Sequence, residues 1–168
     1  GPWKKSYIEG VFHENSLVFD DDGRVYIAYG NREIYITELN EDLTGPKEGG
    51  LHRMAVKDTG DVILGYEGAH FYKINGKYYL FFIHWPKGGL RTEACFCADS
   101  LLAEFTGGDV LSYDLDGIHS GVAQGGIVDT PEGDWYSIMV QEHGAVGRIP
   151  VLVPVTWEND FPVFGNGV

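Results

Sequence analysis

The sequence is poor in basic residues and has no long hydrophobic run. Its 12 lysines and arginines are outnumbered by 25 aspartates and glutamates, which gives a net charge of −13. Nucleic acids and anionic membrane surfaces attract proteins that carry a basic surface, so we exclude both as partners. No stretch of the sequence approaches the ~18 apolar residues that a membrane-spanning helix requires.

Cysteine is also scarce, since Cys95 and Cys97 are the only two. On a strand they point to the same side but lie too close along the chain for an easy disulfide. No neighbouring histidine or cysteine supplies the spacing of a metal site. We therefore predict two ordinary strand cysteines and no metal ligands, and the pair leaves the cellular compartment open.

Glycine and aromatic residues are abundant, with 24 glycines and an aromatic content of 14%. This combination is typical of many short strands joined by tight turns. No segment keeps a helical period, because apolar residues alternate or occur in short β-branched and aromatic blocks. The composition therefore predicts an all-β protein.

The chain repeats one pattern three times, in residues 14–29, 67–82 and 124–139. Each copy predicts a strand, a turn ending in glycine and a second strand, and Asp-Gly and Asn-Gly are strong hairpin signals. A polar residue opens the first strand at the same offset before the turn glycine in all three copies: Glu14, Glu67 and Gln124. We attribute this shared offset to three homologous modules.

Each repeat has room for two further strands. We expect these strands near residues 33–39, 51–56, 91–98, 109–112, 147–155 and 161–164. Four strands in ~50 residues, repeated, predict the blades of a β-propeller, and a β-sandwich is the alternative.

We place the blades at about residues 11–60, 61–115 and 118–165, within one partial propeller domain spanning residues 1–168. Three blades are fewer than the ~4–8 that close a ring. We therefore read the chain as the C-terminal part of a larger ring, with residues 3–9 as the outer strand of a preceding blade. Uncovered apolar blade faces predict association, either as a homo-oligomer or with a complementing N-terminal chain.

The strand openings predict a site, because the innermost strands of all blades begin at the same end of a propeller channel. Glu14, Glu67 and Gln124 would then face one another across the axis. Two carboxylates at one site suit glycoside hydrolysis, in which one protonates the leaving oxygen and another activates water or attacks. Glu67 is the better acid, since Gly68 follows it and His70 is near; a solvated strand-end glutamate is the alternative.

Four more residues are candidates for binding sugar. Arg148 lies between apolar residues and either clamps a ligand or forms a structural ion pair. His70 and His143 are near the strand openings, and hydrogen-bonded strand-end histidines are the alternative for such positions. Trp85 is either a stacking platform for a sugar ring or part of the core.

Three blocks of the sequence resemble glycoside hydrolase family 43. Residues 13–26 are similar to its block HDPSLFFDDDGRVY, and residues 67–79 to its block EGPHLYKINGYYY. Residues 123–135, 147–148 and 154–157 resemble its closing blades. The resemblance implies a five-bladed propeller with inverting β-xylosidase, α-L-arabinofuranosidase or arabinanase activity, and a base, a tuning aspartate and an acid as its three catalytic carboxylates.

The same resemblance implies roles for individual residues. Glu67 matches the general acid, Glu14 stands where the tuning aspartate belongs, and Arg148 matches a substrate-binding arginine. Gln124 replaces a histidine that serves a central calcium ion in the family, so we expect no cofactor and leave that ion as an open alternative.

No aspartate of this chain matches the general base of the family. We therefore expect the isolated chain to hydrolyse glycosides poorly or not at all. Two interpretations follow, both with a carbohydrate partner: an incomplete hydrolase acting on xylose- or arabinose-containing saccharides, and a non-catalytic carbohydrate-binding or assembly module.

Overall fold

The computed structural model describes residues 1–165, and these form twelve strands in three four-stranded sheets. The first sheet contains β1 (Ser16–Phe19), β2 (Val25–Asn31), β3 (Glu33–Glu38) and β4 (His52–Lys57). The second contains β5 (Val62–Ile74), β6 (Lys77–Pro86), β7 (Thr92–Ala98) and β8 (Thr106–Leu111). The third contains β9 (Val122–Asp129), β10 (Trp135–Glu142), β11 (Arg148–Glu158) and β12 (Phe161–Phe164). Single 3-10 turns occupy Leu115–Gly117 and Gly144–Val146.

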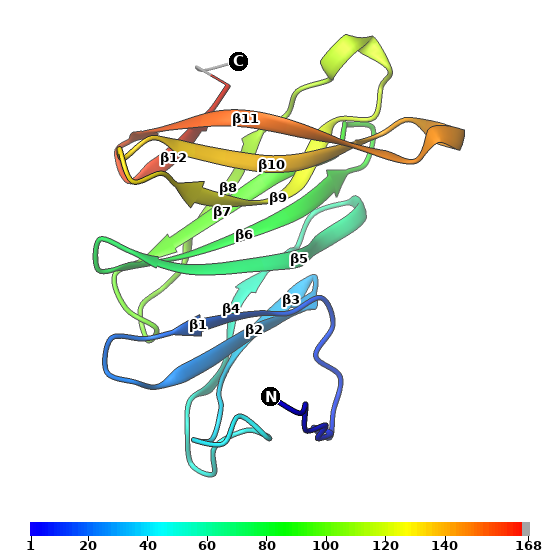
Figure 1. Cartoon of the computed structure of the whole chain (residues 1–168). Helices are drawn as coiled ribbons and strands as arrows, with labels where there is room; N and C mark the ends of the chain where they lie inside the picture. The colour runs from blue at the N-terminus through cyan, green and yellow to red at the C-terminus, as the bar shows by residue number, and fades with distance from the viewer. Residues whose placement is uncertain (166–168) are drawn as a thin grey trace.

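In each sheet the strands run in chain order and pair antiparallel with their neighbours. The three sheets lie one above another in Figure 1, from the blue N-terminal sheet to the orange C-terminal sheet. No helix in residues 1–165 is long and apolar enough to cross a membrane.

The hairpin turns follow the local sequence as predicted. Asn75 and Gly76 have φ angles of 50° and 82°, the paired positive values that an Asn-Gly turn adopts most readily. In the first repeat the Gly23 N–H donates to the Asp20 carbonyl oxygen at 3.0 Å, and in the third the Gly133 N–H donates to that of Thr130 at 2.9 Å. All three turns lie at the same end of the stacked sheets.

Two apolar clusters hold the sheets together. Between the first and second sheets, Tyr26 packs with Phe82 and other buried side chains, and between the second and third, Phe81 packs with Met139. Each of these four residues is at most 1% exposed. The sheets are thus bound mainly by burial of apolar surface, which contributes roughly 25 cal/mol per Å².

Side chains also bond the first strand of each sheet to the next sheet. The Phe71 N–H donates to the Ser16 hydroxyl oxygen at 3.0 Å, and the Ile127 N–H donates to the Tyr72 hydroxyl oxygen at 3.1 Å. At the turn end, Asp20 accepts hydrogen bonds from the Lys73 ammonium group and the Tyr78 hydroxyl group. These bonds fix the register of neighbouring sheets.

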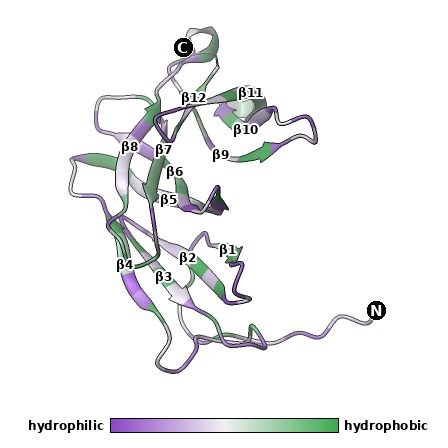
Figure 2. Ribbon diagram, turned by 90° about the vertical axis from the view of Figure 1, so that its left-hand side faces the viewer, coloured by the Kyte–Doolittle hydropathy of each residue, from purple (hydrophilic) through white to green (hydrophobic). Residues whose placement is uncertain are grey.

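Residues 3–9, predicted as the outer strand of a preceding blade, form no strand in the described chain. Trp3 is 100% exposed, and Figure 2 shows the N-terminal segment extending away from the sheets. A strand needs a neighbour to accept its backbone hydrogen bonds, and the inner strands of that blade are not part of this chain, so the outer strand stays a prediction.

Strand β8 also begins earlier than predicted, at Thr106 rather than Asp109. A Cβ atom at Gly107 would lie only 2.0 Å from the Cys95 carbonyl oxygen, so glycine permits a backbone approach that a larger residue would prevent. Both cysteines are free and buried in β7, which confirms their predicted role as strand residues.

Candidate functional site

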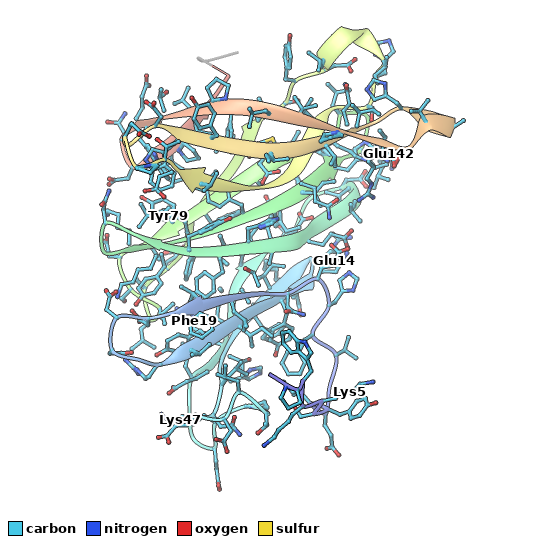
Figure 3. All side chains as sticks on the ribbon, viewed as in Figure 1. Lys5, Glu14, Phe19, Lys47, Tyr79 and Glu142 are labelled. Carbon is cyan, nitrogen blue, oxygen red and sulfur yellow. The ribbon has the colours of Figure 1, made fainter. Side chains whose placement is uncertain are left out.

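The openings of the three repeats meet beside Gly68. A Cβ atom built on Gly68 would lie 3.0 Å from Gln124 Nε2 and 3.4 Å from Glu14 Oε2. Because Glu67 directly precedes Gly68 on β5, the three predicted positions are brought to one place. Figure 3 shows Glu14 at the same end of the sheets as Glu142, opposite Phe19 and Tyr79.

Glu67 is held through one of its two carboxylate oxygens. Its Oε2 accepts a hydrogen bond from the Asn31 side-chain amide and lies 3.2 Å from His13 Nε2. Both partners belong to the first predicted blade (residues 11–60), and the Glu67 side chain is 16% exposed. Within residues 1–165 both of these contacts involve Oε2, and neither involves Oε1.

Glu14 lies beside this carboxylate. One oxygen of Glu14, one oxygen of Glu67 and a ring nitrogen of His13 all lie within 4.8 Å of one another. We call Glu14, Glu67, Gln124, His13 and Asn31 the polar cluster. The sequence interpretation missed His13 and Asn31: His13 was visible as the neighbour of Glu14, whereas no local pattern marks Asn31.

The polar cluster continues into a chain of charged residues along the second and third sheets. Arg148 Nη1 donates to Gln124 Oε1 at 2.9 Å, and Arg148 Nε donates to Glu142 Oε1 at 3.4 Å. Glu142 also pairs with Arg91 at 3.5 Å, and the Arg91 guanidinium lies 4.3 Å from the centre of the Trp85 ring. Arg148 therefore joins the cluster directly, whereas Trp85 is connected to it through Arg91 and Glu142.

The two predicted histidines make contacts with other parts of the protein. His70 Nδ1 lies 2.9 Å from the place of a Cβ atom on Gly126, at the junction of the second and third sheets. Burial lowers the pKa of His70, which keeps its ring neutral at neutral pH. His143 lies in the β10–β11 connection, and its Nε2 is 3.1 Å from Oε1 of Gln141 on β10. This contact is with a residue outside the polar cluster.

The backbone is left-handed at Glu14, at Gln124 and, one position after Glu67, at Gly68. The φ angles are 43° at Glu14, 69° at Gly68 and 61° at Gln124. Glycine adopts this conformation without strain, but glutamate and glutamine do so at a cost of about 1–2 kcal/mol. Strained residues of this kind concentrate at functional sites.

The polar cluster also contains the residues that could hold a metal ion. His13, Glu14 and Glu67 offer two carboxylates and one ring nitrogen. Calcium takes six to eight oxygen ligands, so this group does not fit the calcium ion left open from the sequence.

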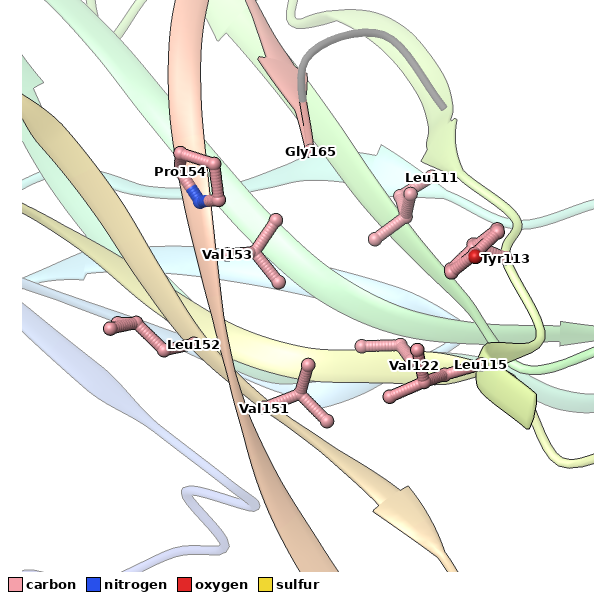
Figure 4. Close-up of a pocket in the computed structure, with 9 residues that line it drawn as sticks. All are labelled: Leu111, Tyr113, Leu115, Val122, Val151, Leu152, Val153, Pro154 and Gly165. Atoms are coloured by element: carbon pink, nitrogen blue, oxygen red, sulfur yellow. The ribbon is translucent and has the colours of Figure 1, made fainter.

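An apolar cavity of 160 Å³ lies elsewhere, between β8, β9 and β11 (Figure 4). Its walls are aliphatic and aromatic side chains such as Leu111, Val122 and Val151, with the Tyr113 ring at one side. Because the described residues that line it include no acid, base or metal ligand, we place the candidate site at the polar cluster.

Comparison with known proteins identifies relatives that match most of the chain. The model of the family "Glycosyl hydrolases family 43" matches residues 14–162. A "Xylosidase/arabinosidase" of Butyrivibrio fibrisolvens is 31% identical over 199 residues, which cover 100% of this chain and 37% of the relative. The chain spans about a third of the length of the curated relatives it matches.

Solved structures agree with this match. The structure described as "Bifunctional GH43-CE Bacteroides eggerthii" has a TM-score of 0.88 and 42% identity, covering 98% of this chain and 21% of that chain. An engineered GH43 glycoside hydrolase with endo-xylanase and exo-arabinofuranosidase activity has a TM-score of 0.80 and 28% identity, covering 95% and 30%. The predicted propeller architecture is thereby confirmed, and this chain supplies about three of the five blades.

Proposed function

Because the chain belongs to glycosyl hydrolase family 43, we propose that its polar cluster is part of a hydrolase site for xylose- or arabinose-containing saccharides. The observation that supports this best is the setting of Glu67. Its Oε2 is fixed between His13 and Asn31, and a second carboxylate lies beside it. A carboxyl group held in this way can present Oε1 to a glycosidic oxygen.

In the proposed reaction Glu67 is the general acid. It donates a proton to the leaving glycosidic oxygen while a water molecule attacks the sugar from the opposite face, which inverts the configuration. Glu14 is the orienting carboxylate next to the acid. Gln124 and Arg148 bind sugar hydroxyl groups, because an amide and a guanidinium group supply several donors in fixed directions. Roles in substrate binding for His70, His143 and Trp85 stay predictions.

The general base must be a residue other than Glu14. Inverting enzymes separate their two carboxyl groups by ~6.5–9.5 Å to leave room for the attacking water. Glu14 and Glu67 have oxygens within 4.8 Å of each other, which is too close for that arrangement. We propose that the base belongs to a further blade of the complete ring.

The outer face of the third sheet is where we propose that such a blade packs. Val128, Ile138 and Leu152 are 56%, 58% and 65% exposed on neighbouring strands, and Ile138 pairs directly with Leu152. A contiguous apolar patch of this kind favours association, either with a second copy or with a complementing chain.

Sugar binding and hydrolysis test different parts of the proposal. In NMR titrations of the whole chain, xylose, arabinose and xylobiose are expected to shift the amide signals of Gly68 and Gln124. In the Glu67→Gln variant, the same sugars are expected to give shifts that differ from those of the natural chain only for residues near Glu67. Failure of all three sugars to shift these signals would refute the substrate class. Turnover of nitrophenyl xyloside or arabinofuranoside by the isolated chain is expected to stay near background. Robust turnover that Glu67→Gln abolishes would show that this chain contains a base.

A non-catalytic carbohydrate-binding or assembly module is the second candidate. The residue at position 14 favours it, because Glu14 stands where the resemblance implies an aspartate and no aspartate of this chain matches the general base of the family. Native mass measurement discriminates the two functions. Assembly with a second chain that supplies an aspartate supports the hydrolase, and a self-associated ring without one supports the binding module.

A further inference from the structure

Strand β9 begins with an unusual backbone. Gln124 has a φ angle of 61°, although it is not glycine, and a Cβ atom on the following Gly125 would lie 2.4 Å from the Ile138 carbonyl oxygen. Gln124 and Gly125 lie at a β-bulge, where the β9–β10 register shifts and the backbone turns left-handed. The Gln124 side chain lies beside Gly68 and Arg148.

A buried glutamate of the neighbouring sheet holds that turn. Glu93 lies on β7 in the same cross-strand row as Glu67, because Ile83 of β6 pairs with both residues. The Glu93 side chain is completely buried. Its Oε2 accepts the backbone N–H of Gln124 at 2.7 Å and that of Gly125 at 3.4 Å.

The burial of Glu93 is energetically unfavourable in itself. Its Oε1 is buried without a hydrogen-bond partner in residues 1–165, and such an atom costs about 1–3 kcal/mol. Burial also raises the pKa of Glu93 well above its ordinary value, although the hydrogen bonds from the Gln124 and Gly125 N–H groups oppose this shift. A glycine at position 124 would remove the backbone strain there, and an apolar residue at position 93 would remove the cost of burying a carboxyl group.

We propose that Glu93 is a positioning residue that holds Gln124, and through it Arg148, in the geometry that binds sugar. The inference rests on the proposed sugar-binding role of Gln124 and Arg148. Strained or unsatisfied groups persist where the surrounding structure uses them to place a functional side chain. Here the strained residue is Gln124 and the unsatisfied group is the Glu93 carboxyl group. The hydrogen bonds that Glu93 accepts maintain the backbone conformation of Gln124.

Three variants of the whole chain separate positioning from general stability. Glu93→Gln keeps the size and an acceptor oxygen, whereas Glu93→Met keeps the size and loses the acceptor. Ser137→Ala is the matched control. The buried Ser137 hydroxyl of β10 donates to the carbonyl oxygen of Gly126 at 2.9 Å, and Gly126 lies on β9, the strand that contains Gln124.

Affinity for xylobiose and arabinose, measured by NMR titration, is the first readout. Glu93→Met is expected to weaken binding about tenfold, the effect of losing one or two hydrogen bonds that orient the ligand-binding amide. Glu93→Gln is expected to bind within about threefold of the natural chain, and Ser137→Ala to lose thermal stability without losing affinity. Equal affinity of Glu93→Met and the natural chain, or an equal loss in Ser137→Ala, would overturn the proposal.

The backbone amide signals of Gln124 and Gly125 are the second readout, and they do not depend on sugar. Both amide protons should resist hydrogen exchange in the natural chain and in Glu93→Gln, and should exchange faster in Glu93→Met. If the natural chain binds neither sugar, the proposed function fails while these signals still decide whether Glu93 holds the turn. If Glu93→Met does not fold, rapid exchange of the Gln124 amide in the natural chain refutes the inference.

Discussion

Replacing Gly68 with alanine tests whether the polar cluster is built around this residue. The new methyl group would lie 3.0 Å from Gln124 Nε2, 3.3 Å from Gln124 Cγ and 3.4 Å from Glu14 Oε2. The substitution also forces an L residue to adopt a φ angle of 69°. One change therefore adds backbone strain and a collision with two side chains of the site.

The expected loss of stability is small and can be matched by a control. A left-handed alanine costs about 1–2 kcal/mol, and the stiffer unfolded chain returns about 0.4–1 kcal/mol. The net loss is about 1 kcal/mol, or about 2–4 °C in Tm for a domain of this size. Gly76→Ala is the control, because Gly76 has a φ angle of 82° and its Cβ position has nothing within 4 Å.

Thermal unfolding and NMR spectra measure the two effects separately. Both variants should lower Tm by similar amounts, but only Gly68→Ala should shift the side-chain amide signals of Gln124 and the Nε–H signal of Arg148. If Gly68→Ala leaves these signals unchanged, the side chains do not converge on this glycine, and the geometry derived for the site is wrong.

Three further predictions concern buried polar groups. Burial raises the pKa of Asp20, but hydrogen bonds, led by the one from Lys73, outweigh burial and hold the pKa below 3.8. These hydrogen bonds therefore stabilise the chain above about pH 4, and their contribution is lost on acidification. In urea titrations from pH 7 to pH 3, Asp20→Asn should start about 1 kcal/mol less stable than the natural chain and should lose less stability as the pH falls. Burial raises the pKa of both Cys95 and Cys97, so iodoacetamide should label neither until the chain unfolds, and mass spectra showing rapid labelling of the native chain would contradict their placement. His84 Nδ1 lies 2.8 Å from Asp109 Oδ1, and His84 Nε2 lies 3.6 Å from Asp58 Oδ2. We therefore expect His84→Phe to lower the free energy of unfolding in urea by about 2 kcal/mol, and an unchanged value would contradict this polar arrangement.

The parts of the fold that the sequence predicts are those specified by neighbouring residues. The hairpin at Asn75 and Gly76 needs only its own φ angles, and repetition of such hairpins indicates the sheets. The shared offset of Glu14, Glu67 and Gln124 predicted convergence because repeated modules place equivalent residues equivalently.

The rest of the site depends on contacts between distant strands. Asn31 reaches Glu67 from the end of β2, and Glu93 reaches the backbone of Gln124 from β7. Neither contact leaves a local pattern, because the partners are brought together only when the sheets pack. The strand predicted at residues 3–9 also depends on distant contacts, since a strand requires a neighbour that the local sequence does not specify.

The hydroxyl groups that join consecutive sheets also protect the protein from unwanted strand addition. The first strand of a sheet has an open edge, and the free N–H groups on such an edge can template pairing with another molecule. Ser16 and Tyr72 occupy N–H groups at the edges of β5 and β9 with side-chain oxygens. An intruding chain would have to displace these oxygens to aggregate there, so we expect amyloid-like pairing of this protein to begin at β1, β4, β8 or β12 instead.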